Sequence, residues 1–356
     1  MLIYNINLTI VFVLLYKARQ ELELNKSKEK YDNYNFIAFM SMFLVSALRN
    51  YTVGTDSEMY MNIFRKINTY TLDSSPIEIG YFFLNKILSF INIFGGYQII
   101  FIITSFIILF LIAKGIIKNS KRYELSVFLF ITMYFYYNSF NQIRQYIAIA
   151  IMFYAIKYIF EKDFKKYAIC AAIAFTFHQS SIIMIPFYFI LQMDLSDKIV
   201  KIVLGLSVVG YLILDKVLLV VFSLIPRYQK YAQGELSSLL TEGSNIVHAI
   251  IILVLFIFVY KFKDKLVSID KRNNIYINAI LFATAFQILG TKTVLFSRIV
   301  YYFSIYAILL IPSIVDIFEG EDKQKAYLAI MAIYFVICNV LLLLNQSEVL
   351  PYMIVH

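Results

Sequence analysis

Twelve apolar segments follow one another along the chain and constrain its fold more than any other feature. Hydrophobic residues make up 61% of the sequence, charged residues only 15%, and the mean hydropathy is +0.73. This composition is typical of a chain whose solvent is largely lipid. We therefore predict an all-α, polytopic integral membrane protein with about 12 transmembrane helices, formed by residues 2–16, 36–48, 98–113, 125–140, 145–160, 168–178, 181–193, 199–222, 246–260, 275–289, 298–315 and 327–344.

A thirteenth apolar segment, residues 80–94, differs from the others. It is interrupted by Asn85 and Lys86, and a Gly-Gly pair follows it. We expect a re-entrant or interfacial segment here instead of a full span.

The chain offers little outside its apolar segments. No polar stretch exceeds about 30 residues, too few to bury an independent core, so residues 1–356 are predicted to form a single integral membrane domain. Cys170 and Cys338 lie inside apolar segments, which indicates packing and predicts neither a disulfide framework nor a metal site. Residues 2–16 lack a basic leader, so we expect a first transmembrane helix and not a cleavable signal.

The chain has a net charge of +9, and its lysine and arginine residues fall mainly between the apolar segments, where they indicate the membrane topology. These residues form short runs instead of one patch, which argues against nucleic-acid binding. If residues 80–94 do not cross, 21 of the 32 Lys and Arg lie on one side and 10 on the other. The positive-inside rule then places both termini outside. The basic side holds residues 17–35, 114–124, 161–167, 194–201, 261–274 and 316–326.

The opposite, outward side gathers unusual polar sequences, which suggests that the working surface faces outside. Arginines at helix ends also serve as interfacial anchors, but several such pieces on one side favour a site. These pieces are ALRNYTVGTDSEMY (47–60), FNQIRQY (140–146), FHQSS (177–181), PRYQKY (226–231), GTKTVLFSR (290–298) and NQSEVLPY (345–352).

Arg144 and His178 are the first candidate site residues, because charged and titratable side chains near a bilayer are costly. Residues 167–193 would form only about 40 Å of helix, whereas crossing the hydrocarbon core twice needs about 60 Å. We therefore expect the HQSS turn to be recessed by about 10 Å, where non-helical backbone is tolerated only beside protein or a wet cavity. Alternatively, His178 caps the turn through hydrogen bonds to Ser180 or Ser181.

Arg144 opens the predicted helix 145–160, so its guanidinium and the free amides of that N-terminus could meet the same anion. Phosphate is the expected ligand class. The aromatic runs YFYY (134–137), PRYQKY and RIVYY (298–302) could stack on sugar faces. An interfacial tyrosine belt predicts the same enrichment in this chain of 29 Tyr, so both interpretations remain.

The order and spacing of these motifs resemble the EpsG family, which is close to the Wzy-type polysaccharide polymerases of bacterial surface glycans. The resemblance covers nearly the whole chain. It is carried by ALRNYTVGTD (47–56), EIGY (78–81), NQIRQYIAIAI (141–151), AFTFHQSSIIMIP (174–186), SRIVYYFSIYAILLIP (297–312) and VLPY (349–352).

The resemblance implies a metal-independent glycosyltransferase of the GT-C-like, integral-membrane kind, without a cofactor. It would join undecaprenyl-pyrophosphate-linked oligosaccharide repeat units on the outer face of the bacterial cytoplasmic membrane, for capsule, exopolysaccharide or O-antigen. A chain-length regulator and a flippase are further candidate partners beside the membrane lipid, and nucleic acid is not one.

The resemblance also suggests roles for particular residues. Such chemistry needs cations for the departing pyrophosphate and a group that accepts the acceptor proton. We assign the second role to His178, because an unperturbed imidazole titrates near pH 6.5. Asp56 would orient the acceptor, activate it or hold an arginine. The residues expected to bind the pyrophosphate or the glycan are Arg49, Arg144, Gln145, Gln179, Arg298 and Tyr301.

Two other classes of function remain open at this stage. A transporter or flippase of lipid-linked sugars would be expected to show internal repeats, and no convincing repeat relates the two halves. A membrane acyltransferase would also suit a membrane histidine, but one that uses cytosolic acyl-CoA needs its histidine on the cytoplasmic side.

Overall fold

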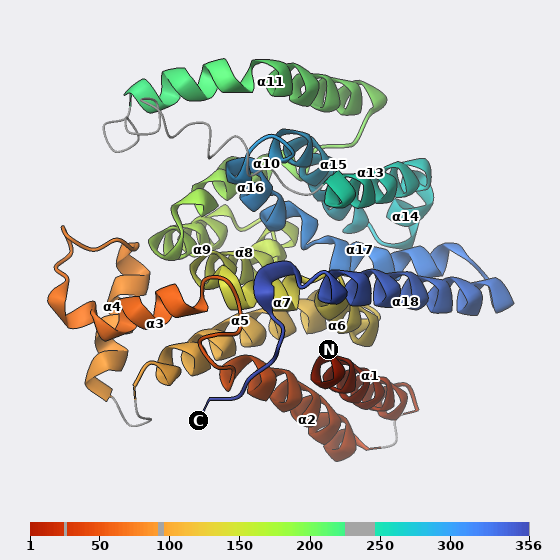
Figure 1. The fold of residues 1–356 in the computed structure, drawn as a ribbon. Helices are drawn as coiled ribbons and strands as arrows, with labels where there is room; N and C mark the ends of the chain where they lie inside the picture. The colour runs from red at the N-terminus through yellow and green to blue at the C-terminus, as the bar shows by residue number, and fades with distance from the viewer. Residues whose placement is uncertain (25–26, 92–95, 225–245, 356) are drawn as a thin grey trace. The chain divides into compact units, whose positions relative to one another are not determined.

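The computed structural model describes residues 1–24, 27–91, 96–224 and 246–355, and within these ranges the fold is helical (Figure 1). No β-strand occurs in this part of the chain; the only extended pairing there is an isolated antiparallel bridge between Arg49 and Ile354. The predicted all-α class is therefore confirmed. All twelve predicted apolar segments coincide with helical structure over the described residues.

Five helices are long and apolar enough to cross a membrane, or six if a pair bent by 50° counts as one span, among the residues described. This supports a multi-pass membrane protein, but the predicted count of twelve is not confirmed. The five are α1 (Leu2–Glu23), α5 (Gln98–Asn119), α8 (Ile143–Phe160), α11 (Asp197–Leu224) and α18 (Gly320–Leu343). The bent pair combines α16 (Val294–Ser304) with α17 (Ala307–Ile314).

Several predicted spans are shorter or broken in the structure. The segment 125–140 divides into α6 (Tyr123–Thr132) and α7 (Phe135–Asn141), because Tyr134 between them has a left-handed φ of 71°. The segments 168–178 and 181–193 become α9 (Phe164–Phe177), a 3₁₀ helix (Gln179–Ile183) and α10 (Met184–Ile190). Hydropathy counts apolar residues whether they face lipid or protein, and helices of this length also suit a protein core.

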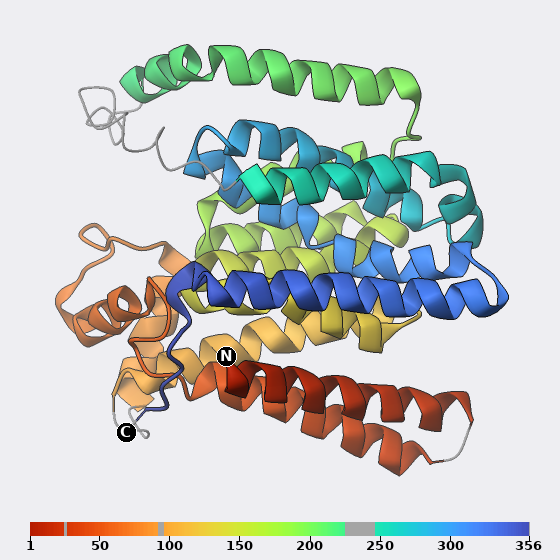
Figure 2. The same cartoon turned by 45° about the vertical axis from the view of Figure 1, so that its right-hand side comes forward.

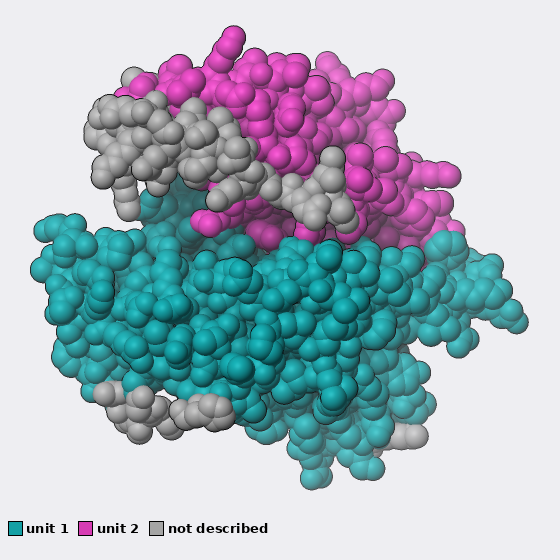
Figure 3. All heavy atoms as spheres, in the orientation of Figure 1, with its two compact units in different colours: residues 1–185, 318–356 teal, residues 186–317 magenta. Residues whose placement is uncertain are grey.

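The chain divides into two compact units, shown in different colours in Figure 3. Unit 1 comprises Met1–Ile185 and Phe318–His356, and unit 2 comprises Pro186–Ile317. The single membrane domain expected for residues 1–356 stays a prediction.

In unit 1, helix α8 occupies the core. It packs against α5 on one side and α9 on another, while α2 (Lys28–Ala47) packs between α1 and α5. The short helix α4 (Ile79–Ile91), which covers most of the predicted re-entrant segment, packs against α9. Its 13 residues make about 20 Å of helix, too little to cross the bilayer alone.

The basic connecting segments and the connecting segments expected to face outward lie at opposite ends of unit 1 (Figure 2). At one end, basic segments are tied by ion pairs of Arg19 with Glu124 and of Lys118 with Glu161. The other end gathers segments expected to face outward, including helix α3 (Ser57–Arg65). His178 contacts Glu78, which precedes α4. The sequence grouping of these segments within unit 1 is thus reproduced in space.

The segment after α18 crosses the second of these ends and pairs with the connection between α2 and α3. The Gly54 amide donates to the Glu348 carbonyl at 2.8 Å, and the Asn50 amide donates to Met353 at 2.8 Å. The Val355 amide in turn donates to the carbonyl of residue 48 at 3.0 Å. The segment therefore holds the chain that leads into α3.

Unit 2 is built around α15 (Asn273–Gly290), which packs against α11, α13 (Ile246–Lys261), α14 (Lys263–Ile269), α16 and α17. Lys292, just after α15, forms an ion pair with Asp215 of α11 at 2.7 Å. This pair joins two apolar helices through charged groups.

Candidate functional site

Arg144 lies in the first turn of α8, where the sequence placed it, but its guanidinium meets a carboxylate that the sequence analysis did not single out. Its Nη1 forms an ion pair with Oε2 of Glu78. The hydroxyl of Tyr60 on α3 also lies near the guanidinium. Arg144 therefore lies between α3 and the residue that directly precedes α4.

His178 ends helix α9 in an extended conformation, with φ −155° and ψ 116°, and the 3₁₀ helix follows directly. Its Nδ1 lies 3.1 Å from Oε1 of Glu78, and its side chain is 18% exposed. The turn itself is closed by the Ser181 amide donating to the His178 carbonyl at 3.1 Å. The imidazole thus contacts Glu78, and the alternative in which it caps Ser180 or Ser181 does not describe this structure.

Glu78 is the residue that sequence reasoning missed. It belongs to the EIGY motif and immediately precedes α4, which is otherwise apolar. The available signal was a single carboxylate at the start of an apolar helix, in a segment assigned to the same side as Arg144 and His178. One carboxylate oxygen contacts the guanidinium and the other contacts the imidazole, so Glu78 bridges the two predicted residues.

Gly80 explains how α4 comes close enough to α9 for this bridge. A Cβ atom at Gly80 would lie 2.8 Å from the carbonyl oxygen of Thr176, a distance that real Cβ atoms essentially never show. Only glycine therefore allows the two helices this approach. Thr176 is two residues before His178, so the contact sets the distance between Glu78 and the imidazole.

The electrostatics of the cluster favour an ionised Glu78. Burial alone would raise the pKa of this carboxyl, whose side chain is 14% exposed. The hydrogen bond from His178 and the charge of Arg144 outweigh burial and lower the pKa of Glu78 to about 2. At neutral pH the cluster thus contains a carboxylate held between a guanidinium and an imidazole.

Asp56 joins the edge of this cluster through Tyr60. It occupies the N-cap position of α3 and is half-buried. Burial raises the pKa of the Tyr60 hydroxyl; the positive charge of Arg144 opposes this shift and the negative charge of Asp56 adds to it. The structure therefore brings Asp56, Arg144 and His178 into one neighbourhood, with Tyr60 and Glu78 between them.

Arg49 makes its contacts with other groups and is only 1% exposed. Its guanidinium carbon stands 4.4 Å from the ring centre of Phe101 and 4.8 Å from that of Phe140. It donates to the carbonyl oxygens of Ser46 and Phe140. The guanidinium is thus enclosed by protein groups in this structure, and its role as a pyrophosphate ligand stays a prediction.

The remaining predicted residues are distributed over both units. Gln145 is buried on α8 beside Arg144, and Gln179 is exposed directly after His178. Arg298 and Tyr301 lie on α16, which belongs to unit 2. Their roles as ligands remain predictions.

The aromatic runs have different outcomes. The residues of YFYY (134–137) are all buried, and the hydroxyl of Tyr136 donates to the Met42 carbonyl at 2.6 Å. This run is therefore core and not a sugar-binding surface in this structure, a difference that arises because aromatic residues suit a tight helical core as well as a glycan. The PRYQKY run lies outside the described residues.

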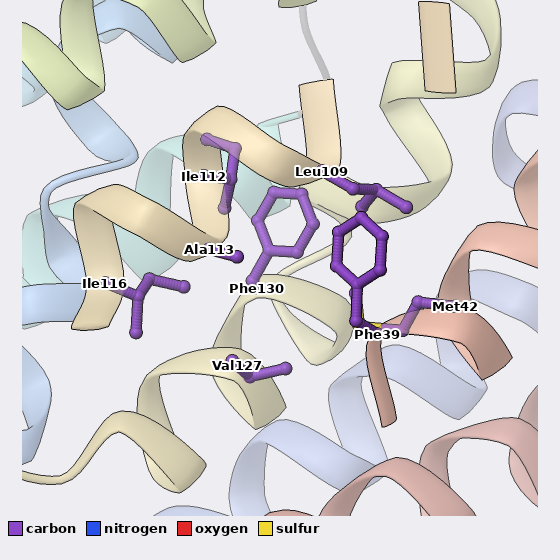
Figure 4. Close-up of a pocket in the computed structure, with 8 residues that line it drawn as sticks. All are labelled: Phe39, Met42, Leu109, Ile112, Ala113, Ile116, Val127 and Phe130. Atoms are coloured by element: carbon purple, nitrogen blue, oxygen red, sulfur yellow. The ribbon is translucent and has the colours of Figure 1, made fainter. Parts of the chain in front are cut away.

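No predicted site residue lines either of two cavities that lie among the described residues. One in unit 1 has a volume of about 30 Å³ and a wholly apolar lining from α2, α5 and α6 (Figure 4). This volume suits little more than one water-sized group. The other, about 480 Å³ in unit 2, is lined by residues of the basic side, including Asp194, Lys263 and Lys271. Within the described ranges, no group of three or more His, Cys, Asp or Glu is arranged to hold a metal ion.

Comparison with known protein families identifies the family of this chain. The model of the EpsG family matches residues 32–354, nearly the whole chain. The chain therefore belongs to the EpsG family, a Wzy-like polymerase family, and the resemblance seen in its motifs is confirmed. No curated protein and no solved structure matches the chain. Membership indicates a polysaccharide polymerase-type membrane protein.

Proposed function

We propose that this member of the EpsG family joins undecaprenyl-pyrophosphate-linked oligosaccharide repeat units on the outer side of the bacterial cytoplasmic membrane. The observation that carries the proposal is the cluster of Arg144, Glu78 and His178 at one end of unit 1. A permanent cation and a titratable base, both partly exposed, are the two groups that glycan transfer from a pyrophosphate carrier requires.

The proposed reaction moves a glycan from one lipid carrier to a second. A hydroxyl of the acceptor repeat unit attacks the anomeric carbon of the donor glycan, and a new glycosidic C–O bond forms. The C–O bond to undecaprenyl pyrophosphate breaks, and the electron pair leaves with the pyrophosphate. The hydroxyl proton passes to His178, which acts as general base or relay.

Arg144 is assigned to the departing pyrophosphate. Its Nη1 pairs with Glu78, whereas its Nε is buried and has no hydrogen-bond partner among the described residues. The side chain is 22% exposed, and its planar fork can bind an oxyanion at two points, so its exposed part is a suitable contact for a phosphate oxygen. Arg298 is proposed as a second ligand, and Asp56 as the group that orients the acceptor.

The number and arrangement of the membrane spans are also part of the proposal. We propose about twelve spans, some of them formed by short or broken helices, in a GT-C-like arrangement with residues 80–94 re-entrant or interfacial. Transfer would need no metal or cofactor. The product would be a surface polysaccharide such as capsule, exopolysaccharide or O-antigen, made together with a flippase and a chain-length regulator.

The experiment that tests this function is polymerisation in a purified system. The protein in lipid nanodiscs is incubated with one defined undecaprenyl-pyrophosphate-linked repeat unit, and the products are separated by size. We expect a ladder of lengthened glycans that is lost in His178→Gln and retained in Glu58→Gln, which changes an exposed carboxylate on α3. Unchanged single repeat units in the wild type would refute a polymerase.

Two outcomes of related assays would assign the protein to another class. Movement of the intact lipid-linked unit across a vesicle membrane, without lengthening, would indicate a transporter or flippase. Transfer of an acyl group to the glycan, dependent on an added acyl donor, would indicate an acyltransferase.

A further inference from the structure

We infer that Glu78 is a positioning residue that fixes the tautomer and orientation of His178, so that Nε2 is the nitrogen presented to the acceptor hydroxyl. The inference rests on the proposed function for its catalytic meaning, but its structural content can be measured without any substrate. It extends the site by a residue that acts through the histidine.

The hydrogen bond between Glu78 and His178 determines which nitrogen of the imidazole carries the proton. An ionised carboxylate only accepts hydrogen bonds, whereas a neutral imidazole donates from one nitrogen and accepts at the other. Because Oε1 of Glu78 lies 3.1 Å from Nδ1 of His178, that nitrogen must carry the proton. Nε2 is then left with its lone pair, which is the form a general base requires.

The carboxylate of Glu78 is held in place on both sides. Glu78 is held at its other oxygen by Arg144, and α4 is held against α9 by the close contact at Gly80. Two hydrogen bonds to different oxygens leave the carboxylate little freedom to rotate. The positions of α4 and α9 therefore determine the orientation of the imidazole, together with the turn after α9.

The Nε2 atom of His178 remains available to a substrate hydroxyl. The only hydrogen bond that the imidazole forms with the described residues is the one to Glu78. The side chain is 18% exposed, so Nε2 is neither satisfied by protein nor fully in solvent. When Nε2 takes a proton, the imidazolium lies beside a carboxylate, which stabilises the charge that forms.

Glutamine at position 78 offers a direct test, because an amide has one acceptor oxygen where the carboxylate has two. Arg144 has only donors and would take that oxygen. The amide NH₂ would then face Nδ1 of His178 and favour the opposite tautomer, with the proton on Nε2. We expect Glu78→Gln to lower kcat by about 10²-fold or more with little change in KM, the range for losing a general base.

The tautomer is read directly by ¹⁵N NMR of histidine-labelled protein in nanodiscs at a pH where the ring is neutral. The chain has 3 His, so the signals of His178 are identified by their loss in His178→Gln. We expect protonated Nδ1 and unprotonated Nε2 in the wild type, and the reverse in Glu78→Gln. A wild-type ring with its proton on Nε2 overturns the inference, even if Glu78→Gln does not fold.

Two further variants separate positioning from other roles. Glu78→Gln should add no further loss in a His178→Gln background, whereas an additive loss would show that Glu78 acts through Arg144 instead. Glu78→Asp keeps the charge but shortens the side chain, and we expect it to retain the tautomer only in part. If the wild type makes no polymer while the tautomer is as expected, the proposed function fails and the hydrogen-bond assignment stands.

Discussion

Two arginine–glutamate pairs, one at each end of unit 1, use the same groups in different surroundings. Glu124 is fully buried, at 0% exposed, and its partner Arg19 is also bonded to Glu23 at 2.6 Å. The pair of Arg144 and Glu78 is partly exposed, at 22% and 14%, and its carboxylate also contacts an imidazole. The chemistry of the pair is therefore not what distinguishes a structural link from a candidate site.

The difference lies in what each pair leaves available. Around Arg19 the guanidinium is bonded to two carboxylates, so an added anion would meet repulsion as well as attraction. Around Arg144 one carboxylate serves both a cation and a titratable ring, and the Nε donor is not used by the described protein. The shared imidazole, more than the ion pair itself, therefore distinguishes the pair of Arg144 and Glu78 from the pair of Arg19 and Glu124.

The largest expected effect tests the imidazole, which only one of the two ends contains. His178→Gln should lower the turnover of the purified polymerase by about 10²-fold or more, because glutamine can hydrogen-bond but is not a base near neutral pH. The measurement is the initial rate of glycan lengthening, with binding of lipid-linked substrate followed separately. Near-full activity in His178→Gln together with an inactive Asp56→Asn would move the base to Asp56.

A second prediction compares the two arginines directly. Arg144→Lys should lower the yield of polymer about tenfold or more, because a point charge replaces a fork that can form two charge-assisted hydrogen bonds. Arg19→Lys, its match at the other end, should leave the rate per folded molecule nearly unchanged. Arg298→Lys is expected to follow Arg144→Lys. Wild-type rates in both outward variants would make these arginines anchors.

The third prediction changes the distance between α4 and α9. Gly80→Ala should lower the thermal midpoint by a few degrees and reduce activity several-fold, because the new methyl group overlaps the Thr176 carbonyl. Gly205→Ala on α11 is the control: its Cβ meets nothing within 4 Å, and alanine favours a helix by roughly 0.5–1 kcal/mol. Equal behaviour of the two variants would remove the packing argument.

The smallest effect concerns acid stability. Because the pKa of Glu78 is lowered to about 2 in the folded protein, its contribution is fully present above the ordinary glutamate value and is lost as the pH falls through about 2. The thermal midpoints of wild type and Glu78→Gln should therefore differ by a few degrees at pH 6 and converge progressively below about pH 4.5. Circular dichroism melting curves in detergent follow this, and a difference that grows on acidification would contradict it.

The sequence was most informative where one residue and its near neighbours decide the outcome. Apolar runs predicted helices, and a change from apolar to polar residues located the start of α8 at Arg144 closely. The number of spans could not be read in the same way, because a buried helix such as α6 has the same hydropathy as one facing lipid. The left-handed residue at Tyr134 that breaks 125–140 has no sequence signal of its own.

The site shows a second limit. Glu78 is separated from Arg144 by 66 residues and from His178 by 100, and no periodicity encodes which distant segments meet. Arg49 was assigned to the site through the resemblance to the EpsG family, whose chemistry needs cations for the pyrophosphate. The two aromatic rings that enclose it come from α5 and α7, so its burial could only be seen in three dimensions.

The pairing of residues 345–355 with the connection between α2 and α3 has a consequence for how the protein is made. About 300 residues separate these partners, and at a typical synthesis rate of roughly 5–20 residues per second the earlier segment waits on the order of 15–60 s for the later one. During that interval the residues leading to Asp56 are already through the ribosome, but they lack their backbone partners. Assembly of this end of unit 1 is therefore a late event that follows insertion of α18, and a nascent chain that stops before α18 cannot complete it.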